Sequence, residues 1–300
     1  MKLLSFRYQG EIRFGPKVKK EEAVWDVVKI QKELSPLKSF PEQLLDAISL
    51  GMEFVEQIRK LTEAAKQSDN PGQFKHSFSE IEWLAPIPRP PKNIICIGKN
   101  YEDHAKEMGA DSAPDAVVVF TKSPTALAAD DETVPVHRDL TDSYDYEGEL
   151  AVVIGKAGRA IPKQLAYDYV FGYTIANDLT ARDLQAKHQQ FFLGKSLPGS
   201  CPMGPYLVTK DEIAPTQQLS IVTKVNDEVR QNGSTGNMIR AVDELISEVS
   251  KYVALEPGDI LLTGTPAGVG KGFNPPKFLK AGDTVKVSVE GIGTLVTHFE

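Results

Sequence analysis

Residues 145–155 read Asp-Tyr-Glu-Gly-Glu-Leu-Ala-Val-Val-Ile-Gly, two glutamates followed by an uninterrupted apolar run. The run from Leu150 to Ile154 has the length of a buried strand. On a strand, Glu147 and Glu149 are two positions apart, so their carboxylates point to the same face. Carboxylates that converge beside a core repel each other unless a cation lies between them, and the stretch therefore indicates a metal site. Taken alone, Glu-x-Glu is more often a solvated strand edge.

A third acid strengthens the prediction of a metal site. Residues 172–178 form another apolar stretch, which ends in Asp178. In isolation Asp178 is typical of a turn or a helix N-cap. Three carboxylates at strand ends, however, make an oxygen-only ligand set that suits Mg²⁺ or Mn²⁺ and leaves positions for water and substrate. Zinc is disfavoured because the five histidines are scattered and the two cysteines form no ligand pair.

Strand patterns dominate the chain from residue 93 to its end. Short apolar runs occupy residues 94–97, 116–120 and 173–176, and residues 219–225 and 285–289 alternate with the period of a strand. There is no regular βαβ alternation and no internal repeat, which argues against a doubly wound fold. We predict an α+β, mainly β fold, with a mixed, mostly antiparallel core. The helices are expected at residues 101–108, 182–191 and 242–252.

The first 80 residues have a different character. Short strands are expected at residues 3–8 and 23–28, and Ser39-Phe-Pro-Glu42 has the form of a helix capping box. Apolar residues then recur at steps of three or four, which predicts an amphipathic helix of about 20 residues. The proline-rich residues 85–91 resemble a junction. We therefore predict a small α/β N-terminal domain over residues 1–85 and a catalytic domain over residues 90–300.

Composition excludes several classes of protein. The chain has 34 basic and 41 acidic residues, a formal charge of −7, and no basic stripe, so nucleic acid is not an expected partner. The isolated cysteines Cys96 and Cys201 favour a reducing compartment. No apolar stretch approaches the roughly 18 residues needed to cross a membrane. The short apolar run at the amino terminus does not fit a signal peptide, so the cytoplasm is the expected location.

Several further side chains are candidates for acid–base chemistry or binding. His104 and Glu107 are three apart on a short predicted helix, where they form either a water-activating pair or an ordinary surface pair. Lys122 and Lys195 each follow an apolar segment and either meet a substrate anion or lie in solvent. Residues 262–270 are rich in glycine, but their spacing to the next lysine does not match a phosphate loop. A substrate-gripping turn that includes Thr265 is the better interpretation.

Taken together, these motifs resemble the fumarylacetoacetate hydrolase family, and the whole chain is most similar to bacterial members with oxaloacetate decarboxylase or acylpyruvase activity. The matching motifs run in family order from residue 90 to the end, in segments 97–104, 120–124, 145–155, 172–185, 194–196 and 263–270.

The resemblance implies a β-roll of mixed sheets, a homodimer and a bound Mg²⁺ or Mn²⁺ held by Glu147, Glu149 and Asp178. It also implies that His104 and Glu107 activate water and that Lys195 neutralises an enolate. The remaining pocket residues would be Lys122, Arg182, Gln185 and Thr265.

The implied activity is C–C bond cleavage of a small 2-oxo acid, by oxaloacetate decarboxylation or acylpyruvate hydrolysis. Fumarylacetoacetate itself is not expected as the substrate, because residues 93–99 lack a further ligating aspartate. One alternative is an isomerase or hydratase that acts on a 2-oxo-dienoate type of acid. The other is a non-catalytic, metal-binding regulatory protein on the same scaffold.

Overall fold

Strand β11 (Gly148–Ile154) lies at the centre of the computed structural model, which describes residues 1–35, 40–109, 114–213 and 218–300. Every residue of β11 is buried. Leu150, Val152 and Ile154 belong to one hydrophobic core, whereas Ala151 and Val153 belong to a second core. Because both faces of the strand are covered from Leu150 onward, residues 150–154 carry only apolar side chains, which explains the uninterrupted apolar run.

The larger sheet has ten strands in the described ranges, and most of its pairings are antiparallel. β5 (Glu82–Trp83) pairs with its second strand, and β8 (Leu127–Ala128) pairs with its third. The other eight lie in the order β2 (Glu11–Pro16), β1 (Lys2–Tyr8), β14 (Cys201–Thr209), β12 (Val170–Asn177), β11, β17 (Ile260–Leu262), β6 (Ile94–Gly98) and β7 (Val118–Lys122).

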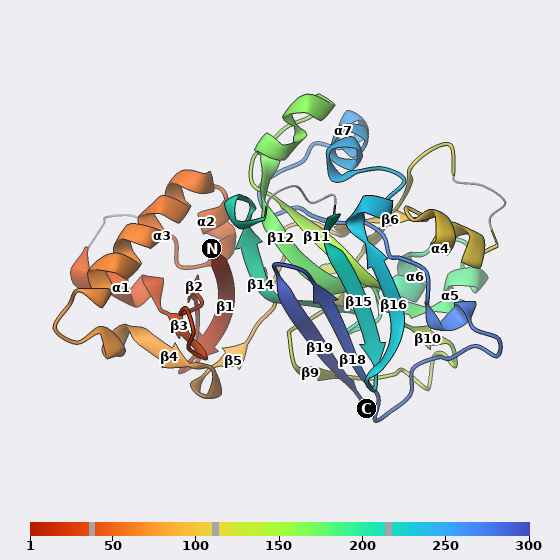
Figure 1. Ribbon diagram of the computed structural model, residues 1–300, viewed down its shortest axis with the longest axis horizontal. Coiled ribbons are helices and arrows are strands. Elements are labelled where there is room, and N and C mark those ends of the chain that lie inside the picture. Colours follow the sequence, from red (N-terminus) through yellow and green to blue (C-terminus); the bar gives the residue numbers. More distant parts are fainter. Residues whose placement is uncertain (36–39, 110–113, 214–217) are drawn as a thin grey trace.

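A five-stranded sheet packs against one face of the larger sheet (Figure 1). Its inner positions include Val285, Val287 and Val289, which alternate with partly exposed residues as their spacing predicts. These valines share a core with Leu150 and Val152 of β11. The strands lie in the order β16 (Glu228–Ser234), β15 (Ser220–Val225), β18 (Thr284–Val289), β19 (Gly293–Phe299) and β9 (Glu132–Val134).

Three N-terminal helices cover part of the opposite face of the larger sheet: α1 (Val27–Leu34), α2 (Leu44–Ile48) and α3 (Gly51–Lys66). The N-terminal β1 pairs directly with β14, so one sheet runs from the first residues into the rest of the chain. Beside it, β3 (Ala23–Trp25) and β4 (Lys75–Ser77) form a small separate ladder. The domain division at residues 85–90 stays a prediction.

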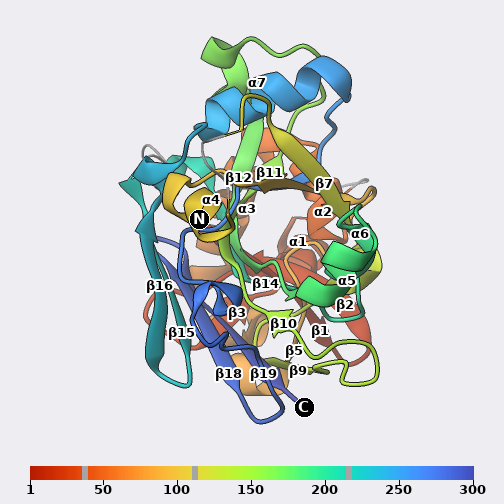
Figure 2. The ribbon, with the colours of Figure 1, turned by 90° about the vertical axis from the view of Figure 1, so that its right-hand side faces the viewer.

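The remaining helices lie around the ends of the central strands (Figure 2). In that view α4 (Glu102–Glu107) lies on one side, and α5 (Arg182–Lys187) and α6 (Phe192–Lys195) lie on the other. Below them, β10 (Tyr144–Asp145) pairs with β13 (Thr180–Ala181). Helix α7 (Val242–Tyr252) has the predicted boundaries. None of the helices in the described ranges is both long and apolar enough to span a membrane.

The predicted α+β, mainly β fold with a mostly antiparallel core is confirmed, but three local predictions differ from the structure. The strand expected at residues 23–28 ends at Trp25, because the Asp26 side chain accepts a hydrogen bond from Lys29 N and caps α1. The helix expected after residue 42 is divided into α2 and α3 near Gly51, whose φ is +65°. Ser39 of the predicted capping box lies outside the described residues.

The third difference concerns residues 182–191, which do not form one helix. Helix α5 ends at Lys187, and Gln189 has a φ of +58° that cannot continue it. Helix α6 then packs closely on α5 at Gly194, where a Cβ would lie 2.6 Å from the backbone nitrogen of Gln185. This close packing brings Lys195 toward the centre of the molecule.

Candidate active site

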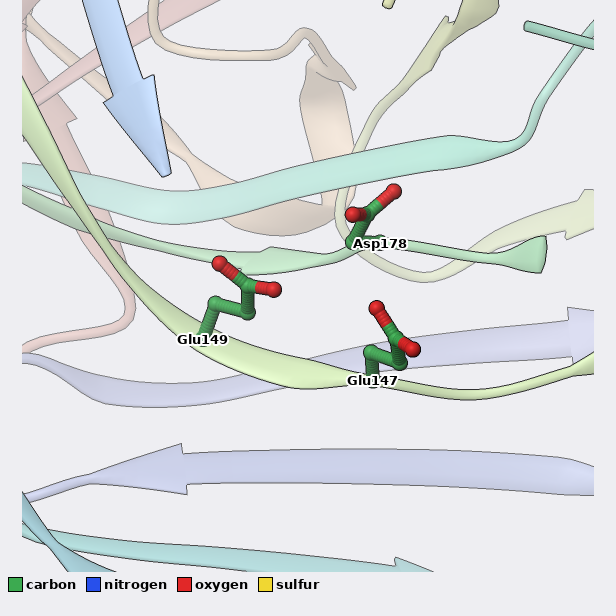
Figure 3. A group of neighbouring side chains, drawn as sticks. All are labelled: Glu147, Glu149 and Asp178. Atoms are coloured by element: carbon green, nitrogen blue, oxygen red, sulfur yellow. The ribbon is translucent and has the colours of Figure 1, made fainter. Parts of the chain in front are cut away.

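Three carboxylates converge where β11 and β12 lie side by side (Figure 3). Glu147, Glu149 and Asp178 are buried, and each offers an oxygen atom within 4.8 Å of those of the other two. The register explains the convergence: Gly148 pairs with Asn177, and Asp178 N donates to Glu147 O at 2.8 Å. The predicted grouping of these three acids is therefore present. Asp178 is not the N-cap of α5, a position that Ala181 occupies.

Three buried cations face two of these carboxylates. Lys195 Nζ donates to Glu147 Oε2 at 2.6 Å and to Asp178 Oδ2 at 2.7 Å. Arg182 Nη2 lies 2.7 Å from Glu147 Oε1, and Lys122 Nζ donates to Asp178 Oδ1 at 2.7 Å. All four oxygens of Glu147 and Asp178 thus face a cation. Each of the three cations is at most 4% exposed.

Glu149 is different from the other two acids. Its Oε2 accepts a hydrogen bond from Gly264 N at 2.7 Å, but no cation among the described residues bonds to it. Burial raises the pKa of Glu149 well above its ordinary value, and the charges of Asp178 and Glu147 raise it further. For Glu147, burial acts in the same direction, but Lys195 and Arg182 hold its pKa below the ordinary value. A carboxylate buried without a cation, beside two others, fits a bound divalent cation.

Asp145 completes a cluster that we call the buried ion network: Asp145, Glu147, Glu149, Asp178, Lys122, Arg182 and Lys195. Asp145 Oδ2 accepts a hydrogen bond from Arg182 Nε at 2.9 Å. Its two oxygens also accept from Gly270 N and Lys271 N, at 2.6 and 3.0 Å. With four carboxylates and three cations, the network has a formal charge of −1, so it has room for added positive charge.

A cavity of about 230 Å³ opens beside the network. Seven of the ten predicted site residues line it, whereas Glu107, Lys122 and Asp178 are not among the lining residues. Lys122 is fully buried and also donates to Leu179 O, so in this structure it holds Asp178 from behind. The complete lining is Ile97, Gly98, Lys99, His104, Met108, Phe120, Glu147, Glu149, Arg182, Gln185, Ala186, Phe191, Lys195, Thr265 and Lys271.

The His104–Glu107 pair lies at the cavity and not on the open surface. His104 Nδ1 lies 3.1 Å from Glu107 Oε2, and the His104 side chain is 7% exposed. Glu107 Oε1 accepts a hydrogen bond from Gly268 N at 2.9 Å, which ties α4 to the glycine-rich residues 262–270. Gly272 also packs against Glu107, where any Cβ would collide with the carboxylate. With Nδ1 engaged by Glu107, Nε2 is the His104 nitrogen left for a ligand.

Two of the predicted pocket residues are engaged by other protein groups. Thr265 Oγ1 donates to Gly148 O at 2.9 Å and accepts from Gln231 Nε2 at 2.7 Å. Gln185 Oε1 accepts from Arg182 Nη1 at 3.4 Å, which leaves its amide nitrogen for a ligand. Thr265 therefore shapes the wall of the cavity and has no hydroxyl proton left to donate.

Sequence reasoning gave no role to four residues of this site. Asp145 and Gln231 support it from behind, since Gln231 Oε1 also accepts from Gly148 N at 2.9 Å. Lys99 and Lys271 line the cavity. Asp145 is the first residue of the motif at 145–155, and Lys99 lies in the motif at 97–104, so the sequence contained a signal for both. Gln231 lies on β16, and nothing in the sequence connects it with Gly148.

Comparisons with known proteins agree with this geometry. The family described as "Fumarylacetoacetate (FAA) hydrolase C-terminal" matches residues 93–300. An uncharacterised protein of Staphylococcus aureus (strain USA300) is 52% identical over 300 residues, which cover 99% of both chains. The solved structure of a fumarylacetoacetate hydrolase from Exiguobacterium antarcticum is 41% identical, with a TM-score of 0.84 over 100% of this chain and 99% of the other.

A second similar solved structure is of a protein named for a different reaction, an isomerisation. The 5-carboxymethyl-2-hydroxymuconate delta-isomerase from Mycobacterium smegmatis is 29% identical, with a TM-score of 0.73 over 100% of this chain and 98% of the other. The sheets, the buried acids and these matches lead to one conclusion. The chain belongs to the fumarylacetoacetate hydrolase family.

Proposed function

We propose that this chain is a divalent-metal-dependent enzyme that cleaves a C–C bond of a small 2-oxo acid, by hydrolysis of an acylpyruvate. One observation carries the proposal. His104 lines the same cavity as the carboxylates Glu147 and Glu149, and its partner Glu107 lies directly behind it. Such a histidine–carboxylate pair is suited to activating water. An imidazole held by a carboxylate at Nδ1 presents Nε2 as a base, and its protonated form is stabilised by the same carboxylate.

Glu147, Glu149 and Asp178 would hold Mg²⁺ or Mn²⁺, since their oxygen-only set suits a hard cation. When bound, the cation would supply Lewis acidity toward the 2-oxo acid. Lys195 Nζ, which also lies 5.0 Å from the centre of the Phe120 ring, would place a fixed positive charge where an enolate develops.

In the hydrolytic step, His104 Nε2 would remove a proton from water as the water oxygen attacks the C4 carbonyl of the acylpyruvate. The C3–C4 bond then breaks, its electron pair remains on the three-carbon fragment, and a proton returns to C3. The products are a carboxylic acid and pyruvate. Glu107 keeps its position in this step, because Gly268 N and His104 Nδ1 bind its two oxygens.

Oxaloacetate decarboxylation is the second reaction that this site would support, because the loss of CO₂ needs no water. The two reactions make different demands on His104. We expect His104→Ala to abolish acylpyruvate hydrolysis and to leave oxaloacetate decarboxylation within a few-fold. Metal affinity, measured by calorimetry, should stay unchanged in this variant; a large loss would make His104 a ligand and overturn its assignment as the base.

The first experiment is to measure the consumption of acetylpyruvate and oxaloacetate with Mg²⁺ or Mn²⁺, corrected for metal-catalysed decay. The Glu147→Ala/Glu149→Ala variant is the control. Metal-dependent turnover that disappears in this variant supports the carboxylate site, and the better substrate decides between the two reactions. Fumarylacetoacetate and a 5-carboxymethyl-2-hydroxymuconate type of acid belong in the panel, because two similar structures carry those names.

The remaining outcomes have definite meanings. Isomerisation without C–C cleavage would support the isomerase alternative. Metal binding with no turnover of any acid in the panel would support a non-catalytic regulatory protein. For the assembly we propose a homodimer, and the apolar side chains Val119, Phe192 and Leu193, all exposed and carried by β7 and α6, provide surface for such a contact. Sedimentation equilibrium at micromolar concentration tests it, and a monomer would overturn it.

A further inference from the structure

Tyr146 lies between Asp145 and Glu147 in the motif at residues 145–155, yet the proposed reaction gives it no role. The Tyr146 side chain is buried. Its hydroxyl donates a hydrogen bond to Gly268 O at 2.9 Å. A buried tyrosine usually finds a partner for its hydroxyl, and here that partner is the backbone of the glycine-rich turn. Tyr146 therefore fixes the position of the Gly268 peptide.

The other side of the same turn holds the His104–Glu107 pair. Gly268 N donates to Glu107 Oε1 at 2.9 Å, and Glu107 Oε2 lies 3.1 Å from His104 Nδ1. Three hydrogen bonds in series thus lead from the Tyr146 hydroxyl through Gly268 and Glu107 to the imidazole. We call this series the tyrosine–histidine chain.

Two glycines leave the tyrosine–histidine chain little freedom to rearrange. Gly268 has a φ of +107°, and a Cβ there would collide with Arg230 O, so the turn packs directly on β16. A Cβ on Gly272 would collide with the carboxylate of Glu107. The carboxylate is therefore confined between Gly268 N, Gly272 and His104 Nδ1.

We propose that Tyr146 is a positioning residue for His104. Acting through the Gly268 peptide, it holds Glu107 where the carboxylate accepts from His104 Nδ1. An ionised carboxylate can only accept, so this bond requires the imidazole proton on Nδ1 and leaves Nε2 free to take a proton from water. The inference rests on the proposed function for the role of His104 as the base. The motif that contains the acids Glu147 and Glu149 would then also orient the base.

Imidazole ¹⁵N NMR tests this role without turnover. In protein labelled with ¹⁵N-histidine and supplied with Mg²⁺, the neutral His104 ring should carry its proton on Nδ1. The His104→Asn variant assigns these signals among those of the five histidines. Tyr146→Phe removes only the hydroxyl, and a second population with the proton on Nε2 should appear.

Gly272→Ala disturbs the same carboxylate from its other side. Gly272 is exposed and its φ lies outside the left-handed region, so its backbone accepts alanine. The new methyl group should push the Glu107 carboxylate away from His104 and make the population with the proton on Nε2 the major one. An unchanged tautomer in both Tyr146→Phe and Gly272→Ala would overturn the proposal.

Tyr144→Phe is the matched control. Tyr144 is also buried and lies two positions earlier, but its hydroxyl has no hydrogen-bond partner among the residues that the structure describes. The variant should leave the His104 tautomer and turnover unchanged. If Tyr146→Phe lowers thermal stability but leaves the tautomer as it is, the hydroxyl has only a structural role and the proposal is wrong.

Turnover separates this proposal from the proposed function. Tyr146→Phe should lower kcat for acetylpyruvate about five- to tenfold. It should leave KM, the affinity for Mg²⁺ and oxaloacetate decarboxylation unchanged, because only hydrolysis needs an activated water. A shifted tautomer in a protein whose unmodified form cleaves no acetylpyruvate would keep the positioning of His104 and refute the acylpyruvase function. Cleavage at equal rates by the unmodified protein and both variants, with an unchanged tautomer, would do the reverse.

Discussion

Glu147 and Asp130 are both carboxylates held largely away from solvent, yet their surroundings differ. Both oxygens of Glu147 face cations, from Lys195 and Arg182. Asp130, between β8 and β9, accepts a hydrogen bond from Val296 N at 2.8 Å, and none of the described residues gives it a cation. Burial raises the pKa of Asp130 to about 6, whereas the cations keep the pKa of Glu147 below its ordinary value.

The comparison shows that burial alone does not decide the charge of an acid. Within the buried ion network, Lys195 and Arg182 face the oxygens of Glu147 and keep its pKa below the ordinary value, whereas the pKa of Glu149, to which no described cation bonds, is raised. Burying these charged groups costs desolvation energy and adds little to stability compared with an apolar core. A role in binding or catalysis therefore explains the buried ion network better than a role in stability does. Among the described residues, no comparable cation bonds to Asp130.

The largest expected effect comes from breaking a buried pair. Lys122→Met removes one of the two lysines on Asp178 and leaves both Asp178 Oδ1 and Leu179 O without their donor. Removing one partner of a buried ion pair costs about 3 kcal/mol or more, since the other charge stays buried. Urea unfolding of the metal-free protein, followed by circular dichroism, should show this loss. A change below about 1 kcal/mol would mean that Lys195 alone satisfies Asp178.

Much of this site was predictable because neighbouring strands carry it. The period of a strand places Glu147 and Glu149 on one face, and the apolar runs around them correctly indicate the central strands β11 and β12. His104 and Glu107 meet because helical spacing brings residues three apart together. These are local rules, and they predict contacts between residues that are close in the sequence.

Long-range partners were not predictable from the sequence. Gln231 supports Gly148 from 83 positions away, and Lys122 reaches Asp178 from 56 positions away. No spacing rule connects residues so far apart, because their contact depends on which strands pair. The break between α5 and α6 was missed for a different reason: its cause is the left-handed backbone at Gln189, a conformation that glutamine rarely adopts.

A smaller effect is expected at Asp130, and it should depend on pH. Because the folded-state pKa of Asp130 is raised to about 6, its favourable contribution is present below its ordinary pKa and is lost as the pH rises through about 6. Asp130→Asn cannot ionise and keeps an oxygen for Val296 N. The variant should therefore gain stability relative to the unmodified protein at pH 8, by at most about 3 kcal/mol, and much less at pH 4.

Thermal unfolding of both proteins across this pH range provides the measurement. A gain that is the same at pH 4 and pH 8 would show that the asparagine acts through packing or hydrogen bonding and that Asp130 ionises without cost. A gain that grows through pH 6 would support the contrast with Glu147.

The smallest effect is expected for an ion pair whose N–O distance is similar to that of Lys122–Asp178 but which lies on the protein surface. Lys66 Nζ lies 3.1 Å from Glu63 Oε2 on α3, but the two side chains are 53% and 58% exposed. Solvent screens such a pair and both charges remain hydrated when it is broken, so Lys66→Met should change the free energy of unfolding by less than about 0.5 kcal/mol. Methionine and lysine have similar helix propensities, so the helix itself is not perturbed. Measured beside Lys122→Met under the same conditions, this variant separates the effect of burial on the free energy of unfolding from the effect of the N–O distance. If the two substitutions cost the same, the 0% exposure of Lys122 and Asp178 would have no energetic consequence, and the buried ion network would be no more than a set of ordinary ion pairs.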